Sequence, residues 1–184
     1  MTIPIHAWQP EHRSSRAGVR LLLILAVAVT SVAFADDPDR QAEVAARGAE
    51  VMPFKLSATT HIFTKIQEGA LQQVIVKDPK DMDQVRLIRQ HLSAVAGQFT
   101  RGDFSGPTDV HGAQMPGLAK LKTAKPGDIE VSYQDLVNGG QIRYSTRDPA
   151  LVHALHQWID AQLSDHGSDS QEGHEHHHPP PPQG

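Results

Sequence analysis

The chain has 184 residues, with 17 basic and 21 acidic side chains and a formal net charge of −4 when histidine is neutral. It contains no cysteine, which excludes disulfides, thiolate metal sites and cysteine nucleophiles. The acidic balance argues against a nucleic acid or an anionic membrane as partner, since both bind basic surfaces.

The first 35 residues have the pattern of a secretory signal peptide. A polar stretch with Arg13 and Arg16 is followed by an apolar run over 19–29 that only Arg20 interrupts, and Ala33-Phe34-Ala35 supplies small residues before a cleavage site. The apolar run is much shorter than the roughly 20 residues that cross a bilayer. We therefore expect cleavage after Ala35 and a periplasmic or extracellular mature protein without a membrane span.

The first half of the mature chain predicts two strands and a helix. Residues 36–51 are charged and alanine-rich and are expected to form a linker or a loose helix before a single domain over 52–166. β-branched residues and alternation predict strands at 59–66 and 70–77, joined by a short turn. Asp78-Pro79 is then expected to open a helix, with Asp78 as its N-cap.

That helix has an apolar stripe at spacings of three and four residues, formed by Met82, Val85, Ile88, Leu92, Val95 and Phe99. A Gly- and Pro-rich loop over 103–117 and a short helix from Pro116 to about Thr123 are expected to follow it.

The second half repeats this plan with an offset of 70 residues. Strands are expected at 128–134 and 141–147, and Asp148-Pro149 opens a closing helix with Val152, Leu155, Trp158 and Ile159 on its apolar side. The offset predicts a ββα–ββα pseudo-repeat. The expected fold is α+β, with an antiparallel four-stranded sheet and two long helices on one face.

Residues 167–184 have no apolar periodicity and are expected to form a disordered tail rich in histidine and proline. Several neutral imidazoles within a few residues chelate zinc, copper or nickel without a fold. The tail therefore predicts contact with a metal ion through His174, His176, His177 and His178.

Histidines within the domain indicate a second metal site. His91 and His156 border the apolar stripes of helices that are expected to be neighbours, so their side chains are expected to approach each other. Further ligands are expected from a strand, the central loop and the end of the last helix: His61, His111 and His166, with Met115 as a soft ligand for copper(I). Each of these histidines also has an alternative as an ordinary boundary residue with one hydrogen bond.

Five stretches of the domain resemble a family of small secreted bacterial proteins. They are TTHIF (59–63), IRQHL (88–92), GDFSGPTDVHGAQMPGL (102–118), DPALVHALHQW (148–158) and DHG (165–167). Members of that family often carry the label aspartate carbamoyltransferase, so the resemblance implies a transferase as an alternative function. The two-domain carbamoyltransferases have S-T-R-T and H-P-x-Q motifs, whereas this chain has Asp148 after Ser145-Thr146-Arg147 and no H-P-x-Q.

The sequence thus favours an exported histidine-rich protein that binds or handles copper or zinc without catalysis. No G-x-S-x-G, P-loop or H-E-x-x-H motif is present, and acidic residues are scattered singly. Two alternatives stay open: the transferase that the family label implies, and an extracytoplasmic partner-binding protein that needs no metal.

Overall fold

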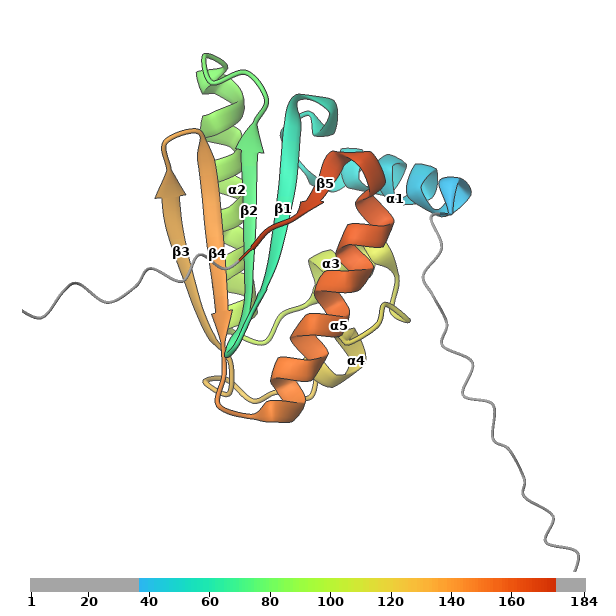
Figure 1. Cartoon of the computed structure of the whole chain (residues 1–184), viewed down its shortest axis with the longest axis vertical. Helices are drawn as coiled ribbons and strands as arrows, with labels where there is room; N and C mark the ends of the chain where they lie inside the picture. The colour runs from blue at the N-terminus through green and yellow to red at the C-terminus, as the bar shows by residue number, and fades with distance from the viewer. Residues whose placement is uncertain (1–36, 175–184) are drawn as a thin grey trace, which may run out of the picture. The chain divides into compact units, whose positions relative to one another are not determined.

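A computed structural model describes residues 37–174 (Figure 1). The predicted signal peptide, 1–35, and the tail histidines His176, His177 and His178 lie outside the described residues. In the described part of the chain, none of the helices combines the length and the apolar character that a membrane crossing requires.

The centre of the fold is a five-stranded sheet with the order β3-β4-β2-β1-β5. Its strands are β1 (Thr59–Ile66), β2 (Gly69–Val76), β3 (Glu130–Leu136), β4 (Gly139–Ser145) and β5 (Ser170–Glu172). The first four are antiparallel neighbours, as the sequence predicts, and β5 lies parallel to β1. The α+β class is confirmed, and the four-stranded antiparallel sheet is corrected to a mixed five-stranded one.

The added strand comes from residues that were expected to be disordered. β5 pairs His61 with Ser170 and Phe63 with Glu172, and its three residues are polar. A strand at the edge of a sheet is held by backbone hydrogen bonds to its neighbour and needs no apolar alternation of its own. The periodicity of the sequence therefore gives no sign of β5.

The helices and 3-10 turns are α1 (Pro38–Val51), η1 (Leu56–Ala58), α2 (Met82–Thr100), α3 (Ser105–His111), α4 (Leu118–Leu121), α5 (Pro149–His166) and η2 (Gly167–Asp169). The segment expected to be a linker or a loose helix forms the regular helix α1, because Asp37 caps its first turn and Pro38 begins it. α1 packs against α3 and α5. The segment predicted as a central loop contains α3, which ends at Gly112 with a φ of +85°.

The two long helices begin differently, although their sequences match. α5 starts at Pro149 with Asp148 as its N-cap, as predicted. α2 starts three residues later than predicted, with Asp81 as its N-cap. The side chain of Asp78 instead accepts a hydrogen bond from the Lys80 amide in a turn before the helix. Met82 is consequently 58% exposed and does not belong to the buried stripe.

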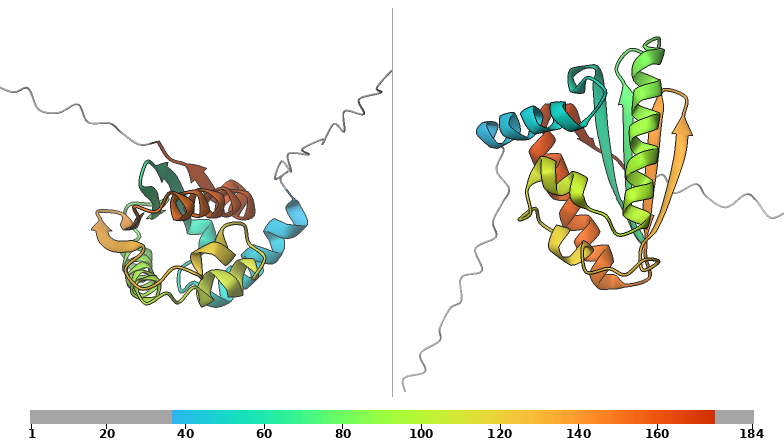
Figure 2. Two further views of the ribbon diagram at one scale, coloured as in Figure 1. Left: turned by 90° about the horizontal axis from the view of Figure 1, so that it is seen from below. Right: turned by 180° about the vertical axis from the view of Figure 1, so that it is seen from behind.

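α2 and α5 pack on the same face of the sheet but over different strands. α2 lies mainly over β3 and β4, while α5 lies over β1 and β2 (Figure 2). Three aromatic side chains join the layers: the rings of Phe99 on α2, Tyr144 on β4 and Trp158 on α5 have centroids 5.4 to 5.9 Å apart. This cluster anchors both helices to one point of the sheet.

The close pairing of β2 and β4 gives a test of the sheet. A Cβ atom on Gly139 would overlap the carbonyl oxygen of Val74 in β2. Gly139→Ala is therefore expected to lower the free energy of unfolding by about 1–3 kcal/mol, measured by urea denaturation.

The matched control is Gly97→Ala in α2, where an added methyl group meets only the end of the flexible Arg101 side chain. This change should leave stability unaltered or raise it by up to about 1 kcal/mol, since alanine is the better helix former. Equal effects of the two substitutions would contradict the observed strand pairing.

Candidate functional site

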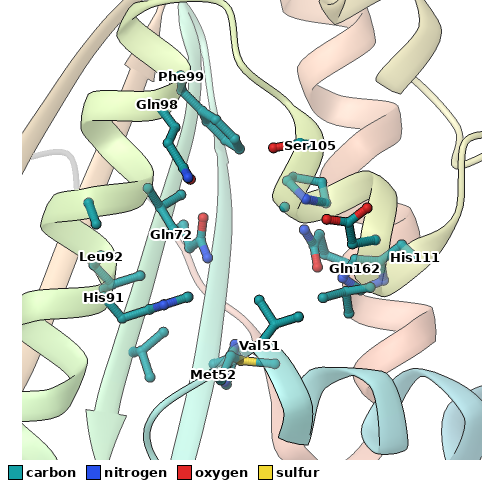
Figure 3. A pocket seen from close by; sticks show the side chains of 18 of the residues that line it. Val51, Met52, Gln72, His91, Leu92, Gln98, Phe99, Ser105, His111 and Gln162 are labelled. Carbon is teal, nitrogen blue, oxygen red and sulfur yellow. The ribbon is translucent and has the colours of Figure 1, made fainter.

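A cavity of about 310 Å³ lies between α2 on one side and α3 and α5 on the other, with the sheet as its floor (Figure 3). β1 and β2 contribute the floor through His61, Gln72 and Val74, and the end of α1 lies at one margin. Aromatic and aliphatic side chains form most of the walls, including Phe54, Leu92, Val95, Phe99, Val110 and Trp158.

Four of the predicted metal ligands line this cavity, and each comes from a different element. His61 lies on β1, His91 on α2, His111 at the end of α3 and His166 at the end of α5. Both helix-terminal histidines precede a glycine with positive φ, +85° at Gly112 and +49° at Gly167. The glycines end the two helices at these histidines, because the left-handed backbone conformation suits glycine.

Three of the four histidine rings are in contact. The rings of His61 and His166 are stacked with centroids 4.6 Å apart, and His111 meets His166 edge-on at 5.2 Å. His91 lies to the side of this cluster, and its ring contacts Phe54 at 5.6 Å. The histidine cluster is defined here as His61, His111 and His166.

Burial favours the neutral form of two histidines of the cluster, His61 and His166. His61 is 3% exposed, and burial lowers its pKa to about 4. Burial also lowers the pKa of His166 well below its ordinary value, and the nearby His61 and His111 lower it further. Neither ring nitrogen of His61 has a hydrogen-bond partner among the described residues. His61 therefore presents neutral imidazole with free nitrogen atoms.

His111 is held differently, by a carboxylate. Its Nδ1–H donates to Oδ2 of Asp165 at 2.8 Å, so Nε2 is the unprotonated nitrogen when the ring is neutral. Arg40 of α1 donates to both carboxylate oxygens of Asp165, at 3.0 and 2.7 Å, and to the carbonyl oxygen of His111. Burial raises the pKa of Asp165, but the hydrogen bonds from His111 and Arg40 outweigh it and lower the pKa to about 2.

Two of the predicted ligands lie elsewhere. His156 donates from Nε2 to the carbonyl oxygens of Ile66 and Gly69, so it fastens α5 to the β1–β2 turn and does not approach His91. Met115 is 4% exposed and packs in the hydrophobic core outside the cavity lining. The tail residue His174 is exposed at the end of the described chain.

Sequence reasoning missed four residues of the site: Arg40, Trp158 as a lining residue, Gln162 and Asp165. Trp158, Gln162 and His166 recur every four residues, which places them on one face of α5. That spacing was a usable signal. Arg40 gave none, because its partner is 125 residues away in the chain.

Within residues 37–174, no three His, Asp or Glu side chains are already arranged to hold a metal ion. Comparison with protein-family models, with curated proteins and with solved structures gave no match. The geometry of the cavity is therefore the basis for assigning a function.

Burial of His61 predicts a loss of stability in weak acid. Its pKa is about 4 in the folded protein and about 6.5 when unfolded, so the unfolded chain binds the extra proton between these values. The stability contributed by neutral His61 is present above pH 6.5 and is lost as the pH falls toward 4. At pH 4.5 the loss from this residue is about 2–3 kcal/mol relative to pH 7.

We expect His61→Phe to reduce the pH dependence of unfolding by that amount, measured by urea denaturation at pH 7 and pH 4.5. His153→Ala, at an exposed position of the same domain, is the control and should keep the wild-type pH dependence. An unchanged pH dependence in His61→Phe would show that His61 does not carry this effect.

Proposed function

We propose that the protein is an exported, non-catalytic binding protein for a late first-row transition metal ion, copper or zinc, with His61, His111 and His166 as ligands. The observation that supports it is the meeting of three imidazoles from separate elements in one cavity, one of them backed by a carboxylate.

The pairing of His111 with Asp165 is the feature most typical of a metal ligand. A ligating histidine usually donates its other ring N–H to a carboxylate or carbonyl, which fixes the tautomer and makes the ligating nitrogen more basic. Here Arg40 holds Asp165 in turn, through two hydrogen bonds. Nε2 of His111 is thus a directed nitrogen donor of the kind that zinc and copper prefer.

His61 and His166 supply the other donors once their rings rotate out of the stacked arrangement. Rotation of His61 breaks no hydrogen bond among the described residues, because neither of its nitrogens makes one. Both imidazoles are neutral because burial lowers their pKa values, so no proton has to leave before a metal ion binds. A buried neutral imidazole without a hydrogen bond gains a partner when it coordinates a metal.

His91 and the tail extend this proposal. His91 contacts Phe54, and the same phenylalanine ring lies 6.0 Å from the His61 ring, so His91 is an outer residue of the site. The tail histidines His174, His176, His177 and His178 act as a separate, weaker chelator in this proposal.

A binding role fits the cavity better than a transferase role. The pair of His111 and Asp165 has the form of a general base, but no Ser, Thr or Tyr hydroxyl among the described residues donates to His111. The Ser145-Thr146-Arg147 segment lies at the end of β4, and the histidine cavity does not include it. The alternative is a protein that binds a partner without metal. That alternative is favoured if metal does not change the melting temperature.

The test uses the full chain with His6, His12 and the four tail histidines replaced by serine, so that every remaining histidine lies in the domain. Zinc or copper(II) at a hundredfold excess over Kd is expected to stabilise it by about 2.7 kcal/mol. That gain corresponds to a rise in melting temperature of a few degrees or more, measured by scanning calorimetry.

Adding His61→Phe should abolish this rise. The change removes two free nitrogens and fits a site already bordered by Phe54 and Phe63, so the fold is expected to persist. His153→Ala is the matched control and should respond to metal like its parent. The proposal is wrong if metal leaves the melting temperature of the parent unchanged, or raises that of the parent and of His61→Phe equally.

A further inference from the structure

The cavity is larger than a metal ion and its ligands require. Its volume of about 310 Å³ is roughly ten times the share of one water molecule in the liquid. It lies at the lower end of the roughly 300–1,000 Å³ that small-molecule sites span. The lining extends beyond the histidine cluster to Val95, Phe99 and Trp158.

Two residues of the cavity lining, Trp158 and Gln162, have buried polar atoms without partners in the described part of the chain. Among the described residues, nothing accepts from Nε1–H of Trp158 or donates to Oε1 of Gln162, although the two residues are only 1% and 4% exposed. They lie one turn apart on α5 and both line the cavity. Buried polar groups are nearly always hydrogen-bonded, so one donor and one acceptor here are suited to a bound molecule.

Gln72 adds a second donor on the floor. Its Oε1 accepts a hydrogen bond from the Tyr144 hydroxyl at 2.8 Å, which fixes the orientation of the amide. The amide NH₂ of Gln72 is thereby left as a donor at the cavity, toward which the side chain points in Figure 3.

The charges of the lining define the class of molecule. The cavity lining includes neither lysine nor arginine among the described residues, and its one carboxylate, Asp109, is exposed. A buried anion would find no lysine or arginine of the lining as its counter-charge, and burying an unpaired charge is costly. The flat walls made by aromatic rings and imidazoles suit an aromatic body.

We propose that the cavity binds a small, uncharged aromatic molecule that carries a group able both to donate and to accept a hydrogen bond. Nε1–H of Trp158 and the Gln72 amide donate to this group, and Oε1 of Gln162 accepts from it. The proposal rests on the cavity volume and the unpartnered atoms of α5, and it is independent of the metal proposal.

The test uses 1-naphthol as the probe, added to the full chain in a buffer with EDTA so that metal plays no part. Binding is followed by calorimetry and by the NMR signal of the Trp158 Nε1–H, which Trp8→Phe distinguishes from the second indole. 1-Naphthol is expected to bind saturably and to shift that signal. The anion 1-naphthoate and the apolar 1-methylnaphthalene should each bind at least tenfold more weakly.

Two variants locate the site. Gln162→Leu removes the unpartnered oxygen at nearly constant volume, and Val95→Phe narrows the cavity from the half-buried face of α2. Each should weaken 1-naphthol binding tenfold or more while the protein stays folded in calorimetric melting. Gln157→Leu, at an exposed position of α5, is the matched control and should bind like wild type.

Three outcomes would overturn the proposal. They are the absence of saturable binding up to millimolar 1-naphthol, equal affinity for 1-naphthol and either comparison compound, and full affinity in both cavity variants. Equal affinity for 1-methylnaphthalene would mean that only the apolar walls bind the probe.

Discussion

The contact of Phe99, Tyr144 and Trp158 is the constraint on which the rest of the site depends. It fixes α2 and α5 to β4 at one point, while elsewhere the two helices follow different strands of the same sheet. Since neighbouring strands of a sheet are rotated relative to one another, helices aligned with different strands diverge. The space that opens between them is the cavity, and Trp158 belongs both to the cluster that closes it and to its lining.

A second network sets the wall opposite α2. Arg40 on α1 holds Asp165 on α5, and Asp165 holds His111 on α3, so three helices meet through one carboxylate. This carboxylate is largely buried, and removing a partner from a buried charge strongly destabilises the fold. The same pairing that positions the wall therefore also selects which nitrogen of His111 is free. Packing and chemistry are coupled at this residue.

The electrostatic character of the cavity follows from these two arrangements. Burial keeps His61 and His166 neutral, and the fixed charges lie behind the wall or at the mouth, in Asp165 and Asp109. Neutral imidazoles have lone pairs for a metal ion, and an uncharged lining with single donors and acceptors suits an uncharged organic molecule. The two proposals concern one cavity, but the metal ion would use the histidine cluster and the organic molecule would use the polar groups of Gln72, Trp158 and Gln162.

The sequence by itself determined the elements whose pattern is local. Alternation predicted both hairpins, the three-four spacing predicted α2 and α5, and the unusual number of histidines pointed to four residues that line the cavity: His61, His91, His111 and His166. Only the tertiary structure decided the rest. β5 is held by backbone pairing with β1, and Arg40 is positioned by a partner far along the chain. Neither arrangement therefore produces a periodic pattern in the sequence. His91 and His156 border similar helical stripes, yet His91 lines the cavity and His156 faces the β1–β2 turn. On α5 it is His166 that lines the cavity. The rotation of α5 about its axis decides which of its histidines lines the cavity. Helical spacing specifies which residues share a face, and packing specifies what that face contacts.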